Sequence, residues 1–154
     1  MLVCTKCYSV YKVSSLYSGS VKQNEEGKFV CPSTTCAGHE LIEVDDQMVD
    51  VVLGLWTVGI RTTESCSGHP RIWSNNPYII LELDESSFAV VSMMRHLNNG
   101  RATIMVNQEE ELIIIEGMEA PEGDISYKHK AQYEFFQFIY EVFNEMGSLK
   151  KLRA

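Results

Sequence analysis

Long hydrophobic runs are missing from this sequence of 154 residues. No stretch approaches the roughly 20 apolar residues that a membrane-spanning helix requires, so we expect neither a transmembrane segment nor a membrane partner. The first residues, MLVCTKC, also lack the basic and apolar regions of a secretion signal. We therefore expect a cytoplasmic protein, and a hydrophobic content of 45% is typical of a globular one.

Basic residues are scarce. Lysine and arginine number 13 against 21 aspartates and glutamates, which gives a net charge of −8 at pH 7. Proteins that hold nucleic acid through its phosphates usually carry a basic patch, so the net charge disfavours such a partner. The lysines within residues 1–42, namely Lys6, Lys12, Lys22 and Lys28, leave nucleic-acid binding open for that part of the chain. An acidic chain is better suited to a basic surface on another protein, and we expect a protein partner.

Several catalytic signatures are absent as well. The sequence contains no phosphate-binding glycine loop, no G-x-G-x-x-G and no H-E-x-x-H. Its acidic pairs and runs stand at expected turns and helix starts, where solvated carboxylates are ordinary. These absences favour a binding protein over an enzyme.

Five cysteines are present, an odd number that favours a metal or a reactive thiol over disulfides in a cytoplasmic chain. Cys4 and Cys7 form C-x-x-C, and Cys31 and Cys36 form C-x4-C, with a turn-rich stretch between the pairs. Two cysteine-bearing turns joined by a hairpin predict a zinc ribbon over residues 1–42, because zinc takes four tetrahedral ligands. We expect these four cysteines to bind Zn²⁺ in a closed, structural site, with His39 as the substitute ligand.

The rest of the chain, residues 43–154, alternates helices with pairs of strands. We expect helices from Asp45 to about Gly59, from Ser86 or Ser87 to about 98, and over 126–146, and strands over 60–65, 78–84, 101–107 and 111–117. This order predicts an α+β domain with a mainly antiparallel four-stranded sheet covered by about three helices.

The segment TTESCSGHP, which contains Cys66 and His69, admits four interpretations. The two residues are a nucleophile and its base, two ligands of a second metal site, part of a ligand-holding loop with Arg71 and Trp73, or a structural turn at a strand end. The structural turn is the default, because no third catalytic residue or further ligand is adjacent in the sequence.

The amino-terminal part of the chain resembles small proteins of phages and of bacteria that carry prophages. In these proteins a ribbon precedes an acidic-capped helix, a glycine and a T-x-x-S-C-S-G-H segment; the matching residues are Cys4, Cys7, Cys31, Cys36, Asp45, Gly59, Thr63, Cys66, Gly68 and His69. The resemblance implies a phage or mobile-element protein that acts on a host process. The segment TTESCSGHP alone is also similar to one in the wybutosine-synthesis methyltransferase family, which has arginine where this chain has His69.

Together these features predict a small zinc-binding, non-catalytic regulatory protein that contacts a host or partner macromolecule. The alternative is a nucleotide- or RNA-directed enzyme, or a ligand-binding protein, that uses the loop from Cys66 to Trp73.

Overall fold

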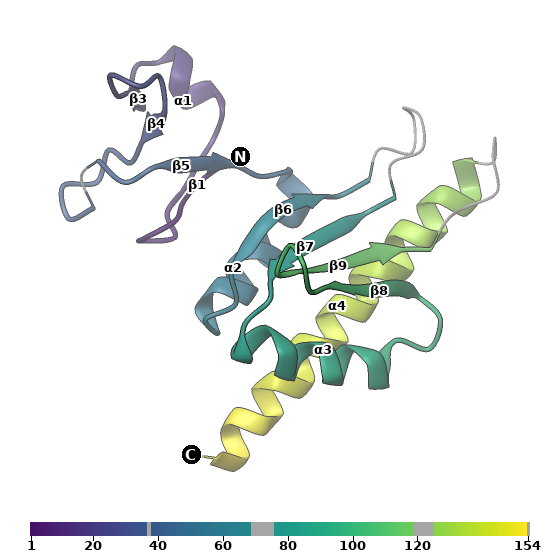
Figure 1. Ribbon diagram of the computed structural model, residues 1–154. Coiled ribbons are helices and arrows are strands. Elements are labelled where there is room, and N and C mark those ends of the chain that lie inside the picture. The colour runs from purple at the N-terminus through teal and green to yellow at the C-terminus, as the bar shows by residue number, and fades with distance from the viewer. Residues whose placement is uncertain (37, 69–75, 119–124, 154) are drawn as a thin grey trace. The chain divides into compact units, whose positions relative to one another are not determined.

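The computed structural model describes residues 1–36, 38–68, 76–118 and 125–153, with the side chains of 125–128 and 148–153 excepted. The chain divides into two compact units, Met1–Val49 and Asp50–Ala154. Within the described residues there are four α-helices and three antiparallel sheets, which confirms the α+β class (Figure 1).

The first unit contains two small sheets. Its elements are β1 (Leu2–Cys4), β2 (Val10–Tyr11), α1 (Ser14–Tyr17), β3 (Lys22–Gln23), β4 (Phe29–Val30), β5 (Leu41–Glu43) and the 3-10 helix η1 (Asp46–Met48). The strands form a sheet of order β2-β1-β5 and a separate β3-β4 hairpin. The region between the cysteine pairs is therefore more than the expected hairpin, because β2 pairs with β1 and a turn of helix follows it.

The division between the units lies later than the sequence-based boundary at residues 42 and 43. Strand β5 pairs with β1 through Glu43, which is opposite Leu2. The backbone N–H of Val44 also donates to the carbonyl of Met1 over 2.8 Å. These contacts attach the chain after residue 42 to the first unit.

The second unit has one sheet and three helices. Its elements are α2 (Val49–Thr57, which begins at the division), β6 (Thr62–Cys66), β7 (Tyr78–Glu82), α3 (Glu85–Leu97), β8 (Ala102–Asn107), β9 (Leu112–Gly117) and α4 (Ile125–Arg153). The sheet is antiparallel throughout, with the order β6-β7-β9-β8. The four expected strands are all present, since alternating β-branched residues bounded by turns specify them locally.

Helix starts were harder to place from sequence. Asp45 precedes a turn of 3-10 helix, and α2 begins only at Val49. The N-cap of α3 is Asp84 rather than either serine: its carboxylate accepts a hydrogen bond from the Ser87 N–H, and the Ser87 hydroxyl accepts one from the Asp84 N–H. This capping box has serine at the position where glutamate is usual, so the sequence lacks the usual signature of a capping box.

The core of the second unit lies between the helices and one face of the sheet. Ile79 and Leu81 on β7 and Ile113 and Ile115 on β9 are 0% exposed. Helix α4 packs on this sheet through residues that are equally buried, namely Phe135, Phe138, Ile139 and Val142. Neither α4 nor any other helix in the described part of the chain is long and apolar enough to cross a membrane.

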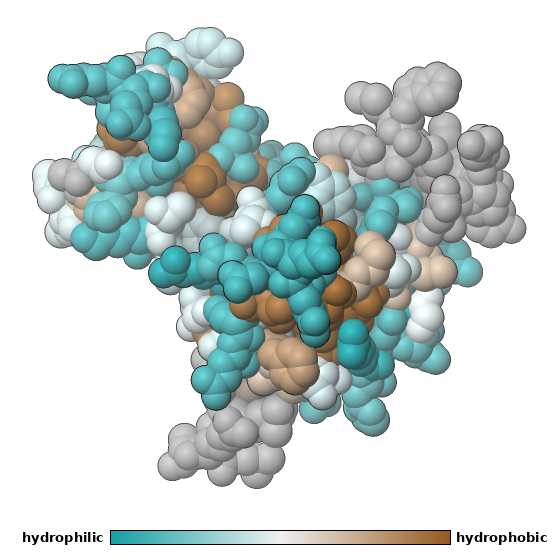
Figure 2. All heavy atoms as spheres, in the orientation of Figure 1, coloured by the Kyte–Doolittle hydropathy of each residue, from teal (hydrophilic) through white to brown (hydrophobic). Residues whose placement is uncertain are grey.

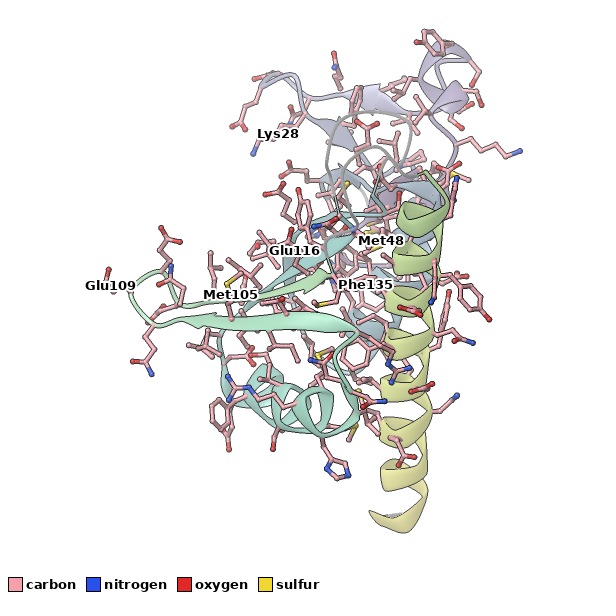
Figure 3. The ribbon with its side chains drawn as sticks, turned by 90° about the vertical axis from the view of Figure 1, so that its right-hand side faces the viewer. Lys28, Met48, Met105, Glu109, Glu116 and Phe135 are labelled. Atoms are coloured by element: carbon pink, nitrogen blue, oxygen red, sulfur yellow. The ribbon has the colours of Figure 1, made fainter. Side chains whose placement is uncertain are left out.

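The opposite face of the sheet carries the alternate residues, because successive side chains of a strand point to opposite sides. We call it the open face, since none of its residues on β7, β8 and β9 is fully buried; they are Tyr78, Ile80, Glu82, Thr103, Met105, Asn107, Leu112, Ile114 and Glu116. In Figure 3, Met105 and the turn that contains Glu109 lie away from α4, whereas Phe135 lies where α4 meets the sheet.

Two glycines on these elements differ sharply in the room around them. A Cβ at Gly117 would lie 2.8 Å from Cγ and 3.1 Å from Cδ of Pro77, whereas a Cβ at Gly147 on α4 would have no heavy atom of the described residues within 4 Å beyond its own helix backbone. We predict that Gly117→Ala destabilises the second unit by about 1–3 kcal/mol through overpacking. Gly147→Ala should instead stabilise it by about 1 kcal/mol through helix propensity. Urea denaturation of both variants measures this, and equal effects of the two would contradict the packing seen at Gly117.

Candidate metal centre

Four cysteines of the first unit meet at one point. Cys4 ends β1 and Cys7 lies in the following turn, while Cys31 directly follows β4 and Cys36 lies in the turn before β5. Pairing of β1 with β5 places Cys4 opposite Leu41, which brings the second pair of cysteines to the first. The four Sγ atoms all lie within 4.8 Å of one another.

The spacing of the sulfurs fits a tetrahedral ion. Metal–sulfur bonds of about 2.3 Å imply sulfurs about 3.8 Å apart on a tetrahedron. The Sγ atoms of Cys7 and Cys31 are 3.8 Å apart, and those of Cys4 and Cys36 are 3.3 Å apart. The four residues can therefore hold a metal ion with only small displacements.

Backbone hydrogen bonds shape both cysteine turns. The N–H of Tyr8 donates to the Cys4 carbonyl over 3.1 Å, and Tyr8 has a φ of 62°. This left-handed conformation closes the tight turn after Cys7, and tyrosine adopts it at a steric cost that glycine would avoid. In the other turn, the N–H of Cys31 donates to the His39 carbonyl over 2.8 Å.

His39 therefore contributes its backbone to this turn. Its side chain is exposed, and the cluster that the described residues form contains cysteines alone. The alternative named from the sequence, in which His39 replaces a cysteine ligand, is not the arrangement in the structure.

Burial and hydrogen bonding act differently on the four thiols. Cys4, Cys31 and Cys36 are at most 3% exposed, whereas Cys7 is exposed. Burial, followed by contact with Cys4, raises the pKa of Cys36 to about 12, because a buried thiolate loses its hydration. Hydrogen bonds with the Ser9 side chain and backbone lower the pKa of Cys7 to about 6.

Two residues that the sequence analysis missed contact these sulfurs. Ser9 Oγ lies 3.2 Å from Cys7 Sγ, and the Tyr11 hydroxyl lies 3.5 Å from Cys31 Sγ. Contact with the Cys31 sulfur raises the pKa of Tyr11. Ser9 and Tyr11 carry hydroxyl groups two and four residues after Cys7, and this spacing is the sequence signal for both contacts. Only the pairing of β2 with β1, however, turns Tyr11 towards the cluster.

The fifth cysteine belongs to the second unit. Cys66 is the last residue of β6, lies opposite Tyr78 and is 8% exposed. Next to it Ser67 is also buried and its carbonyl accepts a hydrogen bond from the Gln132 amide over 2.6 Å, while Gly68 has a φ of 80°. His69, Arg71 and Trp73 lie outside the described residues, so the predicted ligand loop stays a prediction.

Comparison of the chain with models of protein families, with curated proteins and with solved structures gave no match. The fold and the site thus define the class: an α+β protein with a four-cysteine cluster in its first unit.

The contact between Tyr11 and Cys31 gives a testable prediction. A metal-bound thiolate carries no proton, so the Tyr11 hydroxyl must donate to it and stabilise its charge. Removing such an outer partner lowers metal affinity by about 10-fold or more. We expect Tyr11→Phe to show this loss in a competition titration with a chromophoric chelator.

Tyr17 provides the matched control, because it is 90% exposed and the same hydroxyl is removed. Tyr17→Phe should leave the affinity unchanged. Equal affinities for the Tyr11 and Tyr17 variants would show that the hydroxyl of Tyr11 does not act on the metal-bound sulfur.

Proposed function

We propose that this chain is a zinc-stabilised, non-catalytic binding protein, whose first unit is a zinc ribbon and which contacts a partner macromolecule. The observation that carries the proposal is the closed set of four sulfurs around one point, three of them buried. The expectation that the partner belongs to a phage host rests on the sequence resemblance alone.

The donor set favours zinc. Four thiolates in a roughly tetrahedral arrangement suit Zn²⁺ or iron, whereas magnesium and calcium take oxygen ligands. Cys4, Cys7, Cys31 and Cys36 would each give one sulfur, and the 3.8 Å between the Sγ atoms of Cys7 and Cys31 agrees with the zinc–sulfur geometry. Zinc also has no redox chemistry, which suits a structural site.

A structural role follows from the coordination number. Catalytic zinc keeps a position for water, whereas four protein sulfurs fill the tetrahedron. Half of the buried residues in the cluster at the centre of this unit are metal-site cysteines, beside Leu2, Val21 and Leu41. The ion would therefore supply folding free energy that a unit of this size lacks.

Metal removal tests this assignment. We expect the protein to contain one zinc per chain, and a chelator to collapse the amide NMR dispersion of the first unit while the signals of Ile79, Ile113 and other core residues of the second unit persist. Substituted Co²⁺ should give a tetrahedral thiolate spectrum that added azide does not change, because no position is open. A spectrum that responds to azide would contradict a closed site.

Single cysteine variants separate the ligands from the fifth thiol. Cys31→Ser should lose the metal, whereas Cys66→Ser should retain it, since Cys66 belongs to the other unit. Retention of a full zinc equivalent by Cys31→Ser would refute the four-cysteine site.

The binding role is tested on the zinc-loaded chain. We expect a stoichiometric macromolecular partner to co-purify with it at physiological salt and to bind again when both are purified. Tight binding of a small molecule without any such partner would favour the enzyme or ligand-binding alternative.

A further inference from the structure

The four strands of the second unit have an unusual distribution of charge. Strands β6 to β9 contain no lysine or arginine, and their only charged residues are Glu64, Glu82 and Glu116. Glu82 and Glu116 lie on the open face, and Glu64 lies opposite Ile80 and so shares that face. Every charge that the strands carry is thus negative and on one side of the sheet.

Between these carboxylates the open face is apolar. Ile80, Ile114 and Met105 are aligned across β7, β9 and β8, with Ile80 opposite Ile114 and Ile114 opposite Met105. Met105 is 44% exposed, and both isoleucines are half-buried. A solvated face of an antiparallel sheet normally carries polar residues, so this row departs from the usual pattern. Figure 2 shows apolar surface next to the hydrophilic β8–β9 turn.

The dimensions of the row suit one docked segment. Strands about 4.8 Å apart make the row about 10 Å wide, which is close to the diameter of a helix. Glu116 is two residues from Ile114 along β9, on one side of the row. Glu82 is two residues from Ile80 along β7, on the other side of the row. The apolar row is therefore flanked by a carboxylate on each side, with Glu64 at its end.

We infer that the open face is a docking surface for a basic amphipathic segment of another protein. Its apolar side chains would cover Ile80, Ile114 and Met105, and lysines or arginines beside them would meet Glu64, Glu82 and Glu116. A second copy of the chain fits poorly, because it would bring carboxylates against carboxylates in a protein with a net charge of −8. Nucleic acid fits poorly for the same reason. This inference rests on the proposed binding function and specifies its surface.

The hydrogen bonds of these glutamates are compatible with docking. One oxygen of Glu64 accepts from the Tyr78 hydroxyl, and Oε1 of Glu116 accepts from the Asn76 amide over 3.3 Å. These bonds hold the carboxylates in position, and a carboxylate accepts several further bonds. No such contact is present for Glu82 among the described residues, and it is exposed.

A peptide titration of the zinc-loaded full chain tests the inference. The probe is a synthetic helical peptide of leucine on one face with lysine on both flanks, and its control replaces every lysine by glutamate. We expect the lysine peptide to shift the methyl NMR signals of Ile80, Met105 and Ile114, with an affinity that falls as salt rises. The glutamate peptide should leave these signals unchanged.

Variants localise the interaction. Glu82→Gln should weaken lysine-peptide binding by about 2- to 5-fold, and Met105→Lys should abolish the shifts. The matched control is Glu145→Gln on the exposed side of α4, which removes the same charge and should leave peptide binding unchanged. Shifts confined to other surfaces, equal shifts with the glutamate peptide, shifts with an RNA oligonucleotide alone, or concentration-dependent shifts without peptide would each overturn the inference. The cobalt spectrum and a co-purifying partner are measured separately, so the proposed function can hold when this surface fails.

Discussion

The first unit has a small buried core, and this constraint shapes its organisation. The unit ends at Val49, and three of the six residues in its buried cluster are cysteines. Its strands are two or three residues long, which is too short for a sheet to be stable independently. The convergence of four sulfurs is therefore the centre of this unit, and the strands serve to bring the two cysteine turns together.

The second unit is held together by a buried apolar core. One face of its sheet and the inner faces of three helices provide a core made mainly of isoleucine, leucine, valine and phenylalanine. Contacts of α4 with the sheet and with α3 and the close approach of Phe143 to Gly54 on α2 link the helices. The helix packing described above uses one face of the sheet. On the opposite face Cys66 is buried at the end of β6, whereas Met105 is exposed between the carboxylates, which is the basis for the docking surface that we infer.

Prediction from sequence succeeded where the determining interactions are local. The four strands of the second unit and the C-terminal glycine of α2 were placed closely, because alternation and a φ of 85° at Gly59 are properties of short segments. The cysteine spacing indicated the four residues that cluster. Prediction was poorer for the start of α2, for the cap of α3 and for the strands around the cysteines. There the outcome depends on a 3-10 turn, on reciprocal bonding of Asp84 with Ser87, and on β1 pairing with two strands from different parts of the chain.

The sequence by itself determined the class of the fold, the residues that approach one another through C-x-x-C and C-x4-C turns, and the acidic balance of the surface. Only the tertiary structure decided that His39 contributes its backbone and that Tyr11 reaches Cys31. It also decided that the glutamates of three strands lie on one face around Ile80, Ile114 and Met105. The physical reason is that spacing along the chain fixes which side of a strand a residue occupies, whereas strand order and register fix which residues of other strands lie beside it.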